Sequence, residues 1–220
     1  MTRLFVTASG TDIGKTFLMC QLIELLNGHK SLRVLKPVAS GVDLDELAET
    51  DTAQLLKAQG ITPDAATFIA ATPWHFRAPL SPDMAAAREG KAIPFDELIE
   101  HSMAGSEGAL TLIEGIGGAL VPLTEDKTVL DWIEAVSPTL WLVGGTYLGS
   151  LSHTLATLDA IRSRKLVVDT IVVSESEHGA AALNEIVDVV QRFAGPTRVL
   201  PLGRPPTAAQ LAALARALPA

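Results

Sequence analysis

The stretch from Leu4 to Thr16, LFVTASGTDIGKT, decides the fold. An apolar run of strand-forming residues gives way to small and turn-forming residues, and Gly14 and Lys15 then open a segment with apolar positions at helical spacing. The pattern therefore predicts a strand, a tight loop and a helix. Loops of this kind hold phosphates, because free N–H groups and the positive end of the dipole meet at a helix N-terminus and glycine lets the backbone approach an anion.

The loop itself is a variant P-loop. In a P-loop the lysine reaches the β- and γ-phosphates, and the following Ser or Thr hydroxyl ligates Mg²⁺. Lys15 and Thr16 occupy those two positions. The strict spacing GxxxxGK[ST] would place a glycine at position 9, where this chain has Ser9, with Gly10 one place later.

Composition limits the classes of protein to consider. A chain of 220 residues, 48% of them hydrophobic, predicts one α/β domain spanning 1–220. The net charge of −8 argues against a nucleic-acid-binding surface. The single cysteine, Cys20, allows no internal disulfide and favours a reducing compartment. No apolar run reaches membrane-spanning length and no leader pattern is evident, so we expect a soluble, cytoplasmic protein without a membrane partner.

Further strands and helices are expected along the chain. After the first strand, short apolar runs predict strands at 32–35, 109–113, 140–143, 170–173 and 198–200. Helices are predicted over 94–102, 129–136 and 180–193, after the N-cap residue Thr50, after the turn at 147–153, and at the alanine-rich end. The proline-punctuated section 61–91 is expected to run as a long excursion over the sheet edge. The predicted fold is a mostly parallel sheet of about seven strands with helices on both faces.

Polar or glycine-rich turns follow these strands, and in a parallel sheet all such turns lie at the carboxyl edge, where open α/β sheets bind ligands. Lys36 and Glu114 each stand where an apolar strand ends, and Ser40 lies in the loop after Lys36. A carboxylate directly after an apolar strand is costly unless it is paired or metal-bound. Asp51 falls in the first turn of a helix, where the dipole alone could account for it.

The P-loop, the segment KPVASG at 36–41 and the segment EGIGG at 114–118 together resemble the dethiobiotin synthetase family of ATP-dependent ligases, which have the P-loop NTPase fold. The similarity covers most of 4–153, and KPVASG is its most discriminating part. The resemblance implies that diaminopelargonic acid and CO2 form a carbamate, which attacks the γ-phosphate of ATP. The second amine then closes the ureido ring, and ADP and phosphate are released in a step of biotin biosynthesis.

The resemblance also implies a role for each matching residue. Catalysis is assigned to Lys15 at the phosphates, Lys36 at the carbamate and γ-phosphate, and Thr11. ATP is assigned to Asp12, Ile13, Gly14, Lys15, Thr16, Phe17, Glu114, Ser174 and Gly203. The substrate is assigned to Thr11, Lys36, Ser40, Leu148, Gly149, Ser150 and Ser152. Mg²⁺ is assigned to Thr16, Asp51 and Glu114, whose oxygen atoms suit a hard cation. The family contacts the tail carboxylate of the substrate from the neighbouring subunit, which implies a homodimer.

Four positions depart from the family pattern. Ala8 stands where the loop usually begins with glycine, Asp12 where glutamate is common, and Ser152 where asparagine precedes His153. Ser174 stands where an asparagine reads the adenine ring. A hydroxyl cannot supply the paired donor and acceptor of an amide, so we expect a weaker preference for ATP over other nucleoside triphosphates.

Two alternative functions are open. A cobyrinic-acid-synthase-like amide ligase would share the P-loop, but such enzymes carry a glutamine-hydrolysing domain for which 220 residues with one cysteine leave no room. A dimeric ATPase switch of the partitioning type would carry a further lysine early in the loop, where this chain has Ala8 and Ser9. Under the ligase hypothesis, Lys36→Ala is expected to lower turnover by orders of magnitude and to leave folding unaffected.

Overall fold

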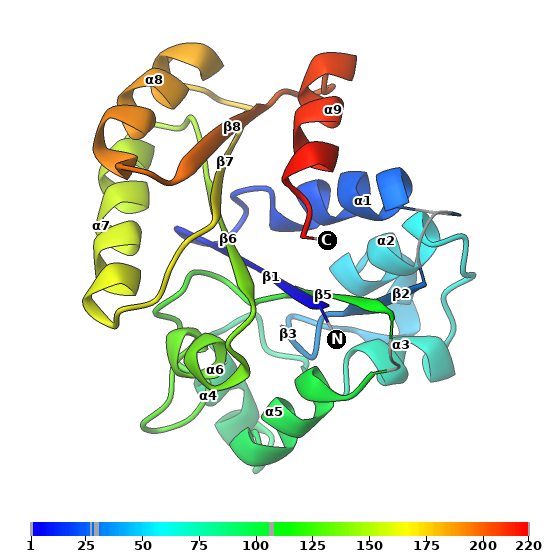
Figure 1. Cartoon of the computed structure of the whole chain (residues 1–220). Helices are drawn as coiled ribbons and strands as arrows, with labels where there is room; N and C mark the ends of the chain where they lie inside the picture. Colours follow the sequence, from blue (N-terminus) through cyan, green and yellow to red (C-terminus); the bar gives the residue numbers. More distant parts are fainter. Residues whose placement is uncertain (1, 27, 29–30, 106–107, 220) are drawn as a thin grey trace.

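The computed structural model describes residues 2–26, 28, 31–105 and 108–219. A main sheet of six parallel strands has the order β2-β5-β1-β6-β7-β8, and β3 and β4 form a separate parallel pair (Figure 1). The prediction of about seven strands in one sheet is therefore slightly too high. The strands are β1 (Thr2–Ala8), β2 (Leu32–Leu35), β3 (Val38–Ser40), β4 (Trp74–Phe76), β5 (Leu110–Glu114), β6 (Thr139–Gly144), β7 (Thr170–Ser174) and β8 (Arg198–Leu202).

Helices cover both faces of the main sheet. Helices α1, α2 and α9 lie on one face, and α4 to α8 lie on the other (Figure 1). The helices are α1 (Lys15–Leu26), α2 (Asp51–Ala58), α3 (Ala65–Ala71), α4 (Pro82–Arg88), α5 (Phe95–Met103), α6 (Val129–Val136), α7 (Ser150–Ser163), α8 (Leu183–Ala194) and α9 (Ala208–Ala217), with a 3-10 helix at Leu44–Glu49.

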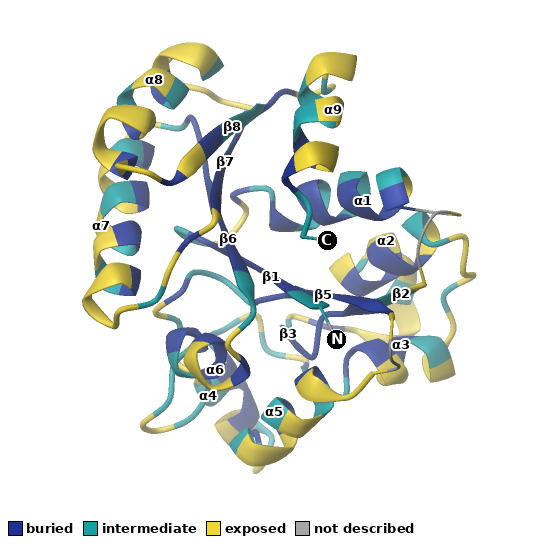
Figure 2. Ribbon diagram, viewed as in Figure 1, coloured by how far each residue is buried: buried dark blue, intermediate teal, exposed yellow. Residues whose placement is uncertain are grey.

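The central strands are apolar because both of their faces are covered. In β1, Leu4 and Val6 pack in the cluster beneath α1, whereas Phe5 points to the opposite cluster and meets Trp132 of α6 edge to face, with ring centroids 4.7 Å apart. Successive strand side chains point to opposite faces, so a strand buried on both sides has no polar alternation. Figure 2 shows the result: a buried sheet within helices whose outer faces are exposed.

Several predicted elements are confirmed, and two predictions are wrong. The helix over 129–136 has the predicted bounds, and Thr50 caps α2 by accepting a hydrogen bond from the Ala53 N–H at 3.1 Å. The section 61–91 is not a plain excursion, because it contains α3, β4 and α4. Ser40 is the last residue of β3, paired with Phe76, and does not lie in a loop.

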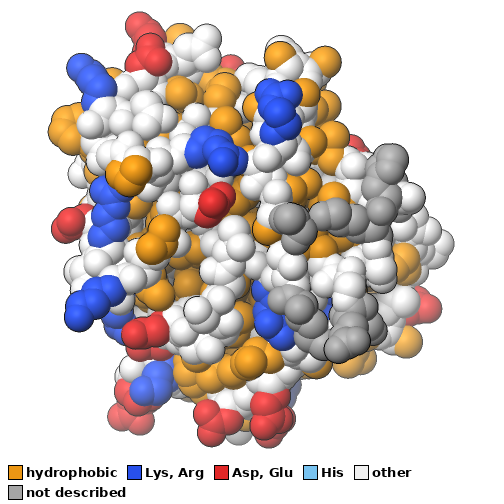
Figure 3. Space-filling model, viewed as in Figure 1, with side chains coloured by type: hydrophobic (Ala, Val, Ile, Leu, Met, Phe, Trp, Pro, Cys, Tyr) orange, Lys and Arg blue, Asp and Glu red, His pale blue; other side chains and the backbone are white. Residues whose placement is uncertain are grey.

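The exposed side chains on the face seen in Figure 3 are of mixed charge and polarity. On the face seen in Figure 3, basic side chains are dispersed among acidic and apolar ones. Within the described residues, no helix is both long enough and apolar enough to cross a bilayer.

The topology places the P-loop at the middle of the carboxyl edge. Strand β1 lies between β5 and β6, and its loop leads into α1, which passes over β5 to β2. Strands β5 and β2 lie on one side of β1, and strands β6, β7 and β8 lie on the other side. Such a reversal of strand order is where open α/β sheets bind ligands.

Candidate active site

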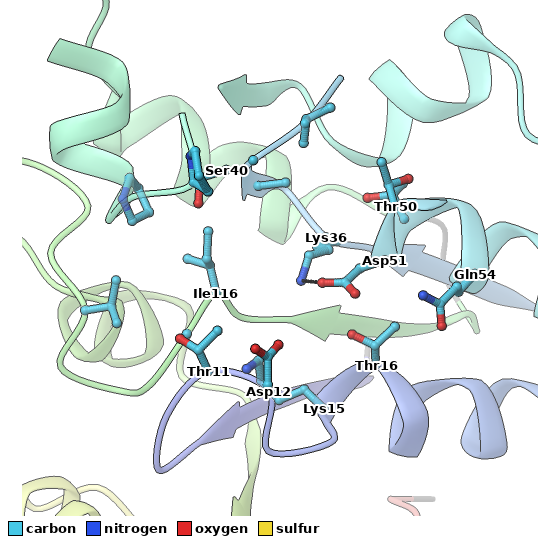
Figure 4. A pocket seen from close by; sticks show the side chains of 18 of the residues that line it. Thr11, Asp12, Lys15, Thr16, Lys36, Ser40, Thr50, Asp51, Gln54 and Ile116 are labelled. Carbon is cyan, nitrogen blue, oxygen red and sulfur yellow. Dashed lines mark ion pairs between the residues drawn. The ribbon is translucent and has the colours of Figure 1, made fainter. Parts of the chain in front are cut away.

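A cavity of about 760 Å³ opens at this edge of the sheet. Its lining includes nine residues predicted for the site, which are Thr11, Asp12, Gly14, Lys15, Thr16, Phe17, Lys36, Ser40 and Asp51. Figure 4 shows Lys15 and Thr16 from the P-loop side facing Lys36 and Asp51 across the cavity. The sheet thus brings together groups that lie up to 40 positions apart in the sequence.

The P-loop has the backbone form that an anion site needs. Gly14 has φ +105°, a conformation that L side chains rarely adopt. A Cβ at Gly14 would lie 2.5 Å from Ser174 Oγ and 2.7 Å from the Arg204 guanidinium, so the loop also packs too closely for a side chain here. Lys15 Nζ donates to the Gly10 carbonyl at 3.2 Å, which folds the lysine back over its own loop.

Lys36 lies in a buried ion-pair network. Its Nζ is 2.6 Å from Glu114 Oε1 and 3.0 Å from Asp51 Oδ2, the ion pair drawn in Figure 4. Glu114 is fully buried, Lys36 is 4% exposed, and Asp51 is about half exposed. Strands β2 and β5 are neighbours in the sheet, so the ends of these two strands place the two charges side by side.

Thr16 joins the same network. Its hydroxyl donates to Glu114 Oε1 at 2.8 Å. The other carboxylate oxygen, Oε2, is buried and has no hydrogen-bond partner within the described part of the chain. A buried carboxylate oxygen without a partner is costly, and an ion bound beside Thr16 and Lys36 that reached it would satisfy it.

The charges at the site alter one another's ionisation. Burial acts to lower the pKa of Lys36, but Glu114 and Asp51 outweigh it and raise that pKa above the ordinary value. Burial likewise acts to raise the pKa of Asp51, and Lys36 outweighs it, so this pKa is lowered. Burial and then the charge of Lys36 lower the pKa of Lys15 to about 8. A polyanion entering the cavity would find the side chains of Lys15 and Lys36 in its lining.

Some predicted residues do not line this cavity. Ile13, Glu114, Ser174 and Gly203 lie outside its lining, and Ser174 is fully buried. The four residues predicted to hold the substrate tail, Leu148, Gly149, Ser150 and Ser152, are also outside it. Leu148 is 88% exposed at the start of the turn into α7. A second cavity, of about 580 Å³, reaches Tyr147 and His153 and shares Thr11 and Asp12 with the first.

The structure adds residues that the sequence did not single out. Arg204, which follows β8, lines the 760 Å³ cavity, as do Gln54 of α2 and Ile116 after β5. The Arg204 guanidinium carbon lies 4.3 Å from the centroid of the Phe17 ring. No local pattern marks an arginine before two prolines as a site residue, and only packing against α1 reveals it.

The chain is similar to known proteins over most of its length. The chain matches the AAA domain family over residues 2–214. It is 44% identical to the ATP-dependent dethiobiotin synthetase BioD of Acidiphilium cryptum, covering 80% of this chain and 81% of the relative. It is 40% identical to the same enzyme of Methylobacterium nodulans, covering 93% and 94%.

Structural comparison supports the fold. The hydrogenase maturation factor HypB of Archaeoglobus fulgidus superposes with a TM-score of 0.57 at 12% identity, over 98% of this chain and 89% of that one, a similarity that concerns the fold alone. Neither the partitioning switch nor the amide ligase gains support from the relatives of high identity. With a P-loop, a KPVASG strand end and this level of identity over most of its length, the chain belongs to the ATP-dependent dethiobiotin synthetase family.

Proposed function

We propose that this protein is an ATP-dependent ligase that makes dethiobiotin from 7,8-diaminopelargonic acid and CO2 in biotin biosynthesis, releasing ADP and phosphate. The family membership supports the overall reaction. The observation that carries the proposal at the level of the site is the contact of Lys36 with Glu114, which in turn accepts from the P-loop Thr16. Through Glu114, the KPVASG segment that begins at Lys36 is linked to Thr16 of the P-loop.

The chemistry requires little covalent help from the protein. One amine adds to CO2 and loses a proton to give a carbamate. A carbamate oxygen bonds to the γ-phosphorus as the bond to ADP breaks, and the second amine then attacks the carbamate carbon and expels phosphate. Negative charge is concentrated where the carbamate meets the triphosphate, so preorganised cations and N–H donors carry most of the catalysis.

Lys36 and Lys15 are two cations of the cavity that suit this task. Lys36 is held charged by its two carboxylate partners, because its pKa is raised. It neutralises charge between the carbamate and the γ-phosphate, while Lys15 and the N–H groups that open α1 hold the phosphates. Thr11 and Ser40 line the same cavity, and each lies four residues from one of the two lysines. They orient the reacting end of the substrate.

Magnesium fits the oxygen donors at this site. Thr16, Asp51 and Glu114 would hold it, directly or through water, and the free Oε2 of Glu114 is the atom that most needs a partner. The described residues contain no cluster of three or more acidic, histidine or cysteine side chains able to hold a metal unaided. When bound, the ion would supply positive charge that neutralises the phosphates.

The test is a reconstituted reaction. The purified protein is mixed with MgATP, bicarbonate and diaminopelargonic acid, and both ADP and dethiobiotin are measured. We expect equal amounts of the two products and no ADP release when the diamine is omitted. ADP release that ignores the diamine and is stimulated by a protein partner would instead support the partitioning switch.

We further propose that the protein acts in the cytoplasm as a homodimer in which the turn at Leu148 to Ser152 contacts the substrate tail bound in the neighbouring subunit. The exposure of Leu148, and the absence of this turn from the 760 Å³ cavity of its own subunit, support the arrangement. The backbone N–H groups that open α7 suit a carboxylate.

A further inference from the structure

The ammonium group of Lys36 lies among the oxygen atoms that are proposed to hold Mg²⁺. Its Nζ is 2.6 Å from Glu114 Oε1 and 3.0 Å from Asp51 Oδ2, so it bridges the two carboxylates. Figure 4 shows the ion pair with Asp51. The third proposed ligand, the Thr16 hydroxyl, donates to the same oxygen of Glu114 at 2.8 Å. The lysine therefore engages the groups that a metal ion would need.

The side chains of Lys36 and Thr16 also lie between Glu114 and the cavity. Both line the 760 Å³ cavity, whereas Glu114 is fully buried and does not line it. Both contact Glu114 Oε1, and the other oxygen, Oε2, has no hydrogen-bond partner within the described part of the chain. A metal ion that enters from the cavity therefore gains access to Glu114 when the Lys36 side chain moves aside.

The charges of these groups favour such an exchange. One ammonium neutralises half of the charge of two carboxylates, whereas a divalent cation matches that charge. The Thr16 hydroxyl is able to ligate a metal ion through its oxygen while its proton still donates to Glu114. Two cations at one buried site repel each other strongly. The flexible stem of a lysine allows its ammonium to leave for another anion.

We propose that Lys36 fills the metal site of the free protein and leaves it for the cavity when Mg²⁺ binds, so that the γ-phosphate and the carbamate replace the two carboxylates as its partners. The assignment of the metal site rests on the proposed function. The exchange adds an order of events to that function: Lys36 becomes available to the substrate only after the carboxylates have taken up the metal ion.

The experiment measures binding of Mn²⁺, used in place of Mg²⁺, to the protein without nucleotide or diamine, from the electron paramagnetic resonance signal of the unbound ion. Lys36→Gln removes the competing charge and keeps a hydrogen-bond donor for Glu114. It is expected to bind Mn²⁺ about tenfold more tightly than wild type. The double variant Lys36→Gln, Glu114→Gln also removes a carboxylate ligand and is expected to lose that gain.

Lys127→Gln is the matched control, because Lys127 lies outside the lining of the cavity and pairs with the exposed Asp126 at 3.1 Å. It is expected to leave the affinity for Mn²⁺ unchanged. Equal affinities of wild type and Lys36→Gln, or no detectable binding by either, would overturn the proposal. A gain that persists in the double variant, or that Lys127→Gln matches, would overturn it too.

Acetylation by acetic anhydride tests the displacement in the wild-type protein, without any substitution. Mass spectrometry compares the modification of Lys36 in ADP with Mg²⁺ and in ADP with a chelator, with Lys127 as the internal reference. Lys36 is expected to react faster with Mg²⁺, because it leaves its buried ion pairs, and an unchanged or slower reaction would contradict the exchange. If Lys36→Gln gains affinity for Mn²⁺ but wild type makes no dethiobiotin, the proposed function is refuted and the exchange stands.

Discussion

At the scale of the residue, Lys36 is a buried cation at the cavity. It is almost fully buried and held between Glu114 and Asp51. A buried charge is tolerated only when it is paired, and breaking such a pair by removing one partner costs about 3–5 kcal/mol. The ion pair therefore argues against the expectation that Lys36→Ala leaves folding unaffected, because that change strands a buried carboxylate.

Lys36→Met is expected to lower kcat at least a hundredfold, a loss of about 2.7 kcal/mol of transition-state stabilisation. It is also expected to lower the free energy of unfolding by about 3–5 kcal/mol, because Glu114 loses its partner. The first quantity is read from steady-state ADP release at saturating diamine and the second from urea denaturation.

The double variant Lys36→Met, Glu114→Gln separates the two effects. Removing the stranded charge is expected to recover part of the lost stability and none of the lost turnover. Recovered turnover in the double variant, or normal turnover in Lys36→Met, would exclude Lys36 from the reaction.

At the scale of the element, helices α5 and α6 are joined by a buried polar contact. Trp132 Nε1 donates to Ser102 Oγ at 2.9 Å, and that hydroxyl donates to the Leu98 carbonyl at 2.7 Å. Both side chains are fully buried. The hydrogen bond lets the indole pack against Phe5 of β1 without leaving its N–H unpaired.

Ser102→Ala is expected to destabilise the protein by about 1–3 kcal/mol, because the buried indole N–H loses its acceptor. Urea denaturation followed by tryptophan fluorescence measures the change. Ser163→Ala removes an exposed hydroxyl that donates to the Ala160 carbonyl within α7 and is expected to be neutral. Equal effects of the two substitutions would show that the contact between α5 and α6 contributes no net stability.

The N-terminal turn of α6 carries a pH-dependent contribution. Burial acts to raise the pKa of Asp131, but hydrogen bonds from Thr128 and the ion pair with Arg164 outweigh it and lower the pKa to about 2. Since the folded pKa lies below the ordinary value of 3.8, this stabilisation is fully present above that value and is lost as the pH falls toward 2.

Asp131→Asn is accordingly expected to cost about 1 kcal/mol at neutral pH, since the pair is partly exposed. The difference from wild type is expected to shrink as the pH falls through that window. Urea denaturation at a series of pH values tests this, with Asp159→Asn on the exposed side of α7 as the control. A difference that stays constant with pH would exclude the ionised carboxylate as its source.

At the scale of the whole molecule, the proposed dimer is open to a complementation test. Lys36→Met disables the reacting end of the site, and Ser152→Glu sets a negative charge where the substrate carboxylate is expected. If the two ends come from different subunits, a mixed dimer contains one intact site. An equimolar mixture after subunit exchange is then expected to recover about a quarter of the wild-type activity.

Activity at low diamine concentration is the measurement, and each variant alone is the control. Recovery above the sum of the two variants would support shared sites. If both ends belonged to one subunit, every site in the mixture would contain a defect, and activity would not rise above that sum.

Local sequence determined much of this protein. The strand, loop and helix of 4–26, the six strands of the main sheet and the placement of Lys36 and Glu114 at strand ends follow from apolar runs, glycine and the GKT triplet. These signals are local, because a strand buried on both faces must be apolar over its whole length. The KPVASG segment indicated the dethiobiotin synthetase family, and the comparisons confirm that family.

Tertiary structure decided the rest. Strands β3 and β4 each have three residues and pair across more than 30 intervening positions, so neither has a periodic signal of its own. The pairing of Lys36 with Glu114 requires β2 and β5 to be neighbours, which the order of elements along the chain does not state. Arg204 enters the site because the end of β8 packs against Gly14 and Phe17. Contacts between distant segments depend on the order of the strands in the sheet and on how the loops pack. No single stretch of sequence determines either of these.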